Sequence, residues 1–195
     1  MSTKKPENTG ELYRNLVVRL RNFVISPVLE WRSIHRESTT FNDMLGNFAL
    51  PLVGLVTIAT FVSHLINQQA FILELAMKKA ILVFVALLGA VFLSWYIVAK
   101  LLKFFQFVVS GELAAKLVIY SSGPLYVISF VTALIPEIFF IYILAFYSFY
   151  LAWLGVRDIA GPVHHRKFVF SVVVGVLVMG IPFLIKILLL NLLTI

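Results

Sequence analysis

The 195-residue chain is 61% hydrophobic and only 13% charged, whereas soluble domains are roughly 45–50% apolar and about 25% charged. A soluble chain of this length has too little interior to bury so much apolar surface, so the composition predicts a bilayer protein. The absence of cysteine excludes disulfides, thiolate metal sites and cysteine nucleophiles. The net charge of +7 could suit nucleic acid, but its distribution along the chain favours a membrane surface instead.

The N-terminal part of the chain is expected to lie outside the bilayer. Residues 1–10 are polar and turn-rich and are expected to form a disordered tail, with no apolar segment typical of a signal peptide. In residues 11–26 apolar side chains recur every three or four positions, which predicts an amphipathic helix. Arg14, Arg19 and Arg21 on this helix are candidates for contact with anionic headgroups on the cytoplasmic side. Docking of the helix on the protein itself explains the pattern equally well.

Two helix starts follow before the first long apolar segment. Serine followed by proline at Ser26 and Pro27 is typical of an N-cap and a first helical position. The short helix that follows carries Trp31 among charged residues, as expected near the headgroups. Thr40 with Asp43 three positions later predicts a capping box. Residues 11–45 are therefore expected to form cytoplasmic amphipathic or interfacial helices.

Five apolar segments come next, each close to the roughly 20 residues that cross a hydrocarbon core. Helices are required because unpaired backbone groups cannot face lipid. The sequence Ile135-Pro136-Glu137 alone separates the third from the fourth, which predicts a tight helical hairpin. The fold class is therefore all-α, a polytopic membrane helical bundle over residues 46–195. The expected spans are residues 46–66, 80–99, 117–136, 138–156 and 168–193.

Two features inside the spans allow a structural and a functional interpretation. Prolines bend the helices that contain them, and broken helices build transport sites in some membrane proteins. Lys186 is the one charge well inside an apolar segment, where its long side chain can reach the outer surface or pair with Glu137. We favour the structural interpretation of the prolines and the surface-reaching lysine. The prolines are Pro51, Pro124, Pro136 and Pro182.

No catalytic, cofactor or metal site is expected. Glu37, Asp43, His164 and His165 gather near the cytoplasmic boundary, but the sequence has no zinc-ligand spacing, no phosphate-binding glycine loop and no nucleophile elbow. A membrane enzyme is accordingly the third hypothesis, with this group as its only support.

Five short motifs occur in order along the chain. They are SPVLEWRSIHRE before the first span, YSSGPLY in the third, ALIP at the hairpin, LAWLGVR at the end of the fourth and GIP in the fifth. Over roughly residues 20–193 they resemble the YIP-domain family, the Rab/Ypt-interacting membrane proteins and their bacterial relatives. The positions that carry the resemblance are Pro27, Trp31, Glu37, Tyr120, Pro124, Pro136, Gly155 and Pro182.

The resemblance implies a five-span helical domain with a cytoplasmic N-terminus and an external C-terminus. Eukaryotic members interact with small GTPases in traffic between the endoplasmic reticulum and the Golgi. This chain lacks their long N-terminal region and is more similar to the short bacterial members. We therefore expect a multi-pass protein of the bacterial inner membrane, without a Rab-type GTPase partner.

Two functions from different classes remain. The leading one is a non-enzymatic membrane protein that organises lipids or membrane partner proteins, alone or as a homo-oligomer, through its basic cytoplasmic face. It would bind anionic lipid headgroups, no cofactor and no nucleic acid. The alternative is a small oligomeric channel or transporter that uses the proline-bent helices. A water-filled cavity across the bundle would favour the alternative.

The basic residues predict the topology. Thirteen of the sixteen lie in the N-terminal segment or in the second and fourth loops, and only two lie in the opposite loops. Because basic loops stay in the cytoplasm, the N-terminus should be cytoplasmic and the C-terminus external. A C-terminal alkaline phosphatase fusion should therefore be active in bacteria. An inactive fusion, beside an active cytoplasmic reporter at the same end, would contradict the five-span topology.

Overall fold

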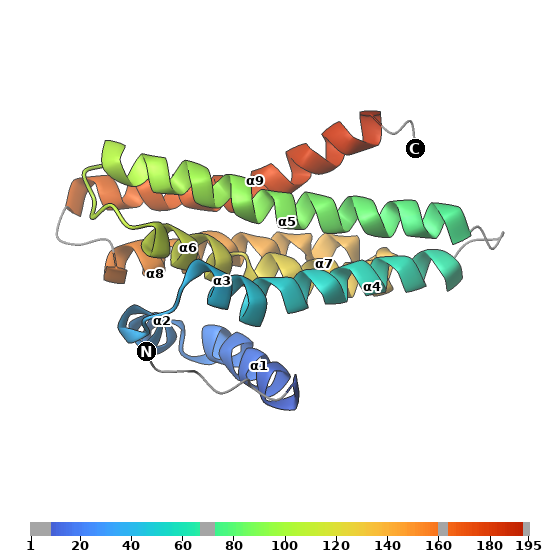
Figure 1. Cartoon of the computed structure of the whole chain (residues 1–195), viewed down its shortest axis with the longest axis horizontal. Coiled ribbons are helices and arrows are strands. Elements are labelled where there is room, and N and C mark those ends of the chain that lie inside the picture. The colour runs from blue at the N-terminus through green and yellow to red at the C-terminus, as the bar shows by residue number, and fades with distance from the viewer. Residues whose placement is uncertain (1–8, 67–72, 160–163, 193–195) are drawn as a thin grey trace.

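The computed structural model describes residues 9–66, 73–159 and 164–192, and every regular element within them is helical (Figure 1). Residues 1–8 of the expected disordered tail lie outside the described residues, and its last two residues instead begin a helix. The elements are α1 (Thr9–Ile25), α2 (Pro27–Arg36), α3 (Phe41–Met44), η1 (Leu45–Ala49), α4 (Leu50–Ile66), α5 (Leu73–Phe104), α6 (Gly111–Ser121), α7 (Gly123–Leu134), η2 (Pro136–Phe146), α8 (Tyr147–Ile159) and α9 (His164–Leu192).

Within the described residues, five helical segments are long and apolar enough to cross a bilayer. They run side by side as a bundle, and α1 and α2 lie against one end of it, here called the α1 end (Figure 1). The opposite end, where α4 stops and α5 and η2 begin, is called the far end. This arrangement confirms the predicted all-α, five-span fold. The segments are Phe41–Ile66, Leu73–Phe104, Gly111–Leu134, Pro136–Asp158 and Arg166–Leu192.

Several helices extend beyond the spans expected from hydropathy. The largest difference is α5, which covers residues 73–104 where residues 80–99 were expected. At about 1.5 Å per residue α5 is about 48 Å long, whereas a hydrocarbon core is about 30 Å thick. Its charged ends therefore reach the headgroup layers, where Glu74 and Lys78 form an ion pair of 2.7 Å one turn apart.

The third span lies at the centre of the bundle. Its most apolar window is 67% buried, against 33–39% for the other four spans. Every residue of α6 from Leu113 to Ser121 is buried, and α6 packs against α5, α8 and α9. Ala114, Ala115 and Ser121 have short side chains, which allow the neighbouring helices to approach closely. The remaining spans surround α6 and α7 and expose their outer faces.

Each of the four prolines in the spans lies at an irregularity of its helix. Pro51 follows the π-helical turns of η1, whose wider winding suits a residue without a backbone N–H. Pro124 begins α7 after a break from α6, and the Ser122 hydroxyl at that break donates to the Val118 carbonyl over 2.7 Å. Pro136 begins η2, and Pro182 lies inside α9.

The first half of the fourth span differs from the regular α-helix expected over residues 138–156. Residues Pro136–Phe146 form a 3-10 helix, with Ile138 outside helical geometry at φ −93° and ψ 28°. Proline at its start and many aromatic and β-branched residues weaken the α-helical preference there. A 3-10 helix rises about 2.0 Å per residue, so these residues cover about 22 Å rather than about 16 Å. The tighter winding extends a short span across more of the bilayer.

The buried Trp31 of α2 fastens the N-terminal helices to α8. Its ring lies against Gly155, where an added Cβ would come within 2.8 Å of two ring atoms and 2.9 Å of Leu117 Cδ2. Glycine at this position is therefore required by the close approach of α2 and α6 to α8.

We expect Gly155→Ala to lower the thermal stability of the detergent-solubilised protein. Overpacking a close contact costs about 1–3 kcal/mol because backbone or ring must move. The matched control is Gly54→Ala, whose added Cβ meets no atom within 4 Å and should leave the melting temperature unchanged or slightly raised. Equal melting temperatures for the two variants would contradict the close contact at Trp31.

Candidate functional site

Two turn structures position the segments around the site at the α1 end. Pro27 begins α2 as predicted, although the Ser26 side chain makes no capping hydrogen bond. The predicted capping box at the start of α3 is confirmed, because the Asp43 amide donates to Thr40 Oγ1 over 3.2 Å and the Thr40 amide donates to Asp43 Oδ2 over 3.1 Å. Residues 37–40 therefore make a fixed connection between α2 and the first span.

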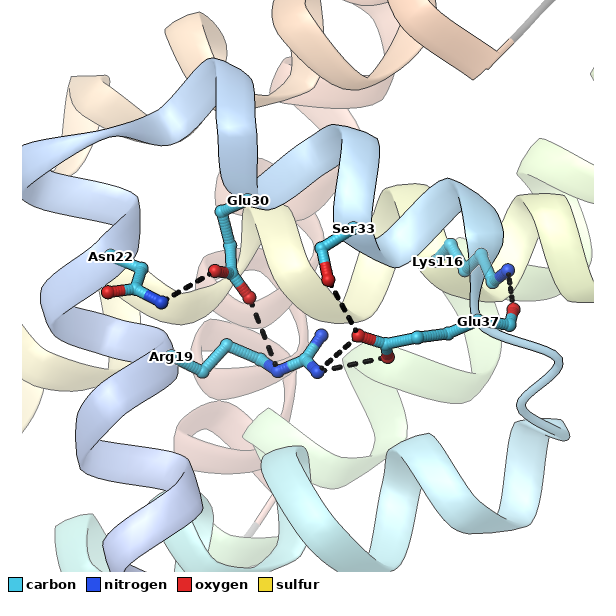
Figure 2. Close-up of polar contacts among 6 residues, drawn as sticks. All are labelled: Arg19, Asn22, Glu30, Ser33, Glu37 and Lys116. Atoms are coloured by element: carbon cyan, nitrogen blue, oxygen red, sulfur yellow. Dashed lines mark hydrogen bonds and ion pairs between the residues drawn. The ribbon is translucent and has the colours of Figure 1, made fainter.

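Arg19 of α1 lies between two carboxylates (Figure 2). Its Nη2 donates to Glu37 Oε1 over 2.8 Å and to Glu37 Oε2 over 2.9 Å, and its Nε lies 3.6 Å from Glu30 Oε1. Asn22 Nδ2 donates to Glu30 Oε2 over 2.8 Å, and Ser33 Oγ donates to Glu37 Oε1 over 3.3 Å. These contacts join α1 to α2, and we call the five residues the ion-pair cluster.

Aromatic rings form the base beneath this cluster. The guanidinium carbon of Arg19 lies 5.0 Å from the centre of the Tyr120 ring, in cation–π range. Tyr120 in turn makes edge contacts with Trp31 at 6.3 Å and with Phe48 at 5.0 Å between ring centres, and a tilted contact with Phe23 at 6.0 Å. The charged network is therefore built directly on the apolar core.

Lys116 connects the central helix to the same site. Its Nζ donates to the backbone carbonyl oxygen of Glu37 over 2.6 Å (Figure 2). One helical turn further along α6 stands Tyr120, so a single helix contributes both the lysine and the aromatic base. Glu37 at the end of α2 is thus held twice: Arg19 binds its carboxylate, and the Lys116 ammonium binds its backbone carbonyl.

A polar pocket of about 330 Å³ opens beside the cluster. Glu30, Glu37 and Asp43 line it together with Arg19. Burial alone lowers the pKa of the Arg19 guanidinium, but Tyr120 and the two glutamates outweigh it and raise that pKa above its ordinary value. Arg19 therefore stays charged, and Nη1 is buried without a hydrogen-bond partner among the described residues. Within those residues no group of three or more potential ligands could hold a metal ion.

The predicted lipid-facing arginines separate into two groups. Arg14 and Arg21 are exposed on α1, whereas the Arg19 side chain is 23% exposed and points into the ion-pair cluster. Assigning Arg19 to the lipid surface was therefore wrong. The sequence carried a signal for this, since Arg19 shares a helical face with Leu12, Leu16 and Phe23 at offsets of seven, three and four residues.

The other predicted positions are only partly brought together. Trp31, Glu37, Tyr120 and Gly155 converge at this site, whereas Pro124, Pro136 and Pro182 lie at the helix irregularities described above. Among the described residues no ion pair joins Glu137 to Lys186, and Lys186 lines a separate cavity at the far end. Glu37 and Asp43 both line the polar pocket, but the side chains of His164 and His165 lie outside the described part of the structure. Sequence reasoning missed Glu30, Asn22 and Lys116 as site residues.

We expect Arg19→Gln and Glu37→Gln each to destabilise the protein. Hydrogen bonds to charged groups contribute about 1.5–3 kcal/mol, and each single change leaves the other charge partly buried without its partner. The double variant should lose less than the sum of the two, because contacting residues are energetically coupled. Thermal unfolding in detergent measures all three. Arg14→Gln on the exposed face of the same helix is the control and should have no effect. Strictly additive losses would contradict the coupling.

The family model of the Yip1 domain matches residues 21–185 of this chain. No curated protein and no solved structure matches the chain. The matched region contains Trp31, Glu37, Lys116, Tyr120 and Gly155, and it covers the first four membrane-length segments in full and the fifth as far as residue 185. Because the match covers most of the 195 residues, the chain belongs to the Yip1 domain family of membrane proteins.

Proposed function

We propose that this Yip1-family protein is a non-enzymatic organiser of anionic lipid in the leaflet at its α1 end, which is the cytoplasmic leaflet of a bacterial inner membrane. In this proposal α1 lies in the headgroup layer, and the ion-pair cluster holds it in a fixed position on the bundle. The observation that carries the proposal is the exposed face of α1.

α1 carries apolar side chains on its exposed outer face as well as on its buried inner face. Leu16 and Phe23 on the inner face are 4% and 2% exposed, whereas Val17 and Val24 on the outer face are 60% and 74% exposed. Exposed apolar side chains such as Val17 and Val24 are unfavourable in water, and a lipid interface would cover them. Arg14 and Arg21 lie beside these valines and are also exposed.

The charge at this end suits anionic headgroups. The last turn of α5, the end of α8 and the start of α9 meet at the α1 end of the bundle (Figure 1), and they carry Lys103, Arg157 and Arg166. Basic residues near an anionic leaflet contribute about 1 kcal/mol each to attachment. The arginines of α1 therefore add to a surface that already attracts anionic lipid.

The contacts that fix α1 on the bundle support a role in organising lipid rather than a role as a mobile tether. The helix is held by Arg19 to Glu30 and Glu37, and by the Tyr147 hydroxyl, which donates to the Phe23 carbonyl oxygen over 2.8 Å. A helix held at a set depth and angle imposes that geometry on the lipids around it. Homo-oligomers or membrane partner proteins could pack on the same apolar face.

The channel or transporter alternative receives less support. In the described part of the chain, the polar pocket at the α1 end and the cavity at the far end have no lining residue in common. An open channel would require a continuous polar path between the two ends.

Site-directed spin labelling tests where the outer face of α1 lies. Because the chain has no cysteine, Val17→Cys and Val24→Cys each provide a single labelling site in the full-length protein. In liposomes of anionic lipid, both labels should collide with oxygen more than with a water-soluble nickel complex. The control is Glu11→Cys, an exposed position on the same helix, which should show the reverse. Labels shielded from both reagents would indicate a protein contact and would contradict the lipid assignment.

Replacement of the two outer arginines tests the lipid preference itself. Arg14→Gln with Arg21→Gln should weaken the enrichment of fluorescent phosphatidylglycerol around the reconstituted protein, and the effect should shrink at high salt. Each arginine is also replaced singly, and Lys78→Gln at the far end is the control that matches these single variants in charge. Enrichment that is unchanged by the double substitution would contradict a role for α1.

A further inference from the structure

A larger cavity lies at the far end of the bundle, between α4, α5, α7, η2 and α9. Its volume is about 980 Å³, at the upper end of the roughly 300–1,000 Å³ usual for ligand sites. It lies apart from α1 and from the ion-pair cluster. Neither the family match nor the proposed role of α1 accounts for it.

The bend of α9 helps to open this cavity. Pro182 removes a backbone hydrogen bond inside the helix, and the last turns of α9 diverge from α5 (Figure 1). Gly180, just before Pro182, lines the cavity, and an added Cβ there would meet no atom within 4 Å. The space is thus a consequence of the GIP motif in the fifth span.

The lining changes in character along the bundle axis. The part near the bilayer centre is apolar and includes Leu87, Leu125 and Val176, whereas His64, Lys79 and Lys186 lie at the far end. Among the described residues that line the cavity, none is acidic. The Nδ1–H of His64 donates to the Thr60 carbonyl over 3.0 Å, since a carbonyl only accepts, so Nε2 of the neutral ring is an acceptor and suits a headgroup hydroxyl rather than a phosphate oxygen.

We propose that this cavity binds an anionic glycerophospholipid of the surrounding membrane. Its phosphate would lie between Lys79 and Lys186, and an acyl chain would extend into the apolar part. The lining of α9 from Val176 to Lys186 represents about 15 Å of helix, which matches the about 15 Å of hydrocarbon in one leaflet. The cavity is therefore long enough for a full acyl chain.

An empty cavity, a hydrophilic solute and a neutral lipid each account for less of the lining. A lysine that only reaches for the surface explains Lys186 but not the second lysine, Lys79, in the lining of the same cavity. A hydrophilic solute would find few partners in the apolar part, whereas a neutral lipid would leave the basic groups without a counter-charge. An anionic amphiphile satisfies both parts at once.

Lipid analysis of the purified full-length protein tests the proposal. The protein is exchanged into mixed micelles of phosphatidylglycerol and phosphatidylcholine in equal amounts, re-purified and analysed by native mass spectrometry. We expect retained phosphatidylglycerol in preference to phosphatidylcholine. Lys79→Gln and Lys186→Gln should each lower its retention about fivefold, and Lys78→Gln, adjacent on α5 but outside the lining, should not.

Substitutions that fill the cavity provide a second, independent test of lipid retention. Gly180→Leu should reduce the retention of both lipids, and Gly54→Leu, which also projects into open space but outside the cavity, should leave it unchanged. Arg14→Gln with Arg21→Gln should not alter this retention, which separates the cavity from the proposed role of α1. Equal retention of the two lipids, or equal effects of Lys78→Gln and Lys79→Gln, would overturn the proposal. So would retention that survives Gly180→Leu.

Discussion

The placement of a single guanidinium group determines how the N-terminal helices sit on the bundle. Arg19 is mostly buried, and a buried charge is tolerated only with opposite charge and hydrogen bonds around it. Glu30 and Glu37 supply both, and Tyr120 supplies the ring beneath. Because the two carboxylates come from α2 and its end, satisfying Arg19 fixes α1 and α2 relative to each other and to the central span.

The central third span connects the N-terminal helices to the rest of the bundle. Lys116 holds the backbone at Glu37, and Tyr120 contacts Arg19, while the opposite side of α6 packs among α5, α8 and α9. Close contact at Gly155 then ties Trp31 of α2 to α8. A Yip1-family domain is thus a membrane bundle whose most buried helix also carries the polar site at its end, so that disturbing either one should disturb the other.

The two ends of the bundle offer different chemistry. The α1 end combines a polar pocket with an exposed apolar and basic helix, and the far end has an apolar cavity with a basic mouth. Both suit anionic lipid, one from outside the bundle and one from within it. Among the described residues the pocket and the cavity have no lining residue in common.

The sequence by itself determined the membrane class, the five spans, the hairpin at Pro136 and the capping box at Thr40, because hydropathy, proline and local hydrogen bonding act over a few residues. Only the tertiary structure decided where the charges lie. The spacing from Leu12, Leu16 and Phe23 places Arg19 on the apolar face of α1, but its carboxylate partners lie 11 and 18 residues away, on and just after a helix whose packing no local pattern specifies. Likewise Lys186 lines the far-end cavity together with Lys79 and His64, and no ion pair joins it to Glu137 among the described residues, because the packing of α9 rather than local sequence sets the neighbours of its side chains.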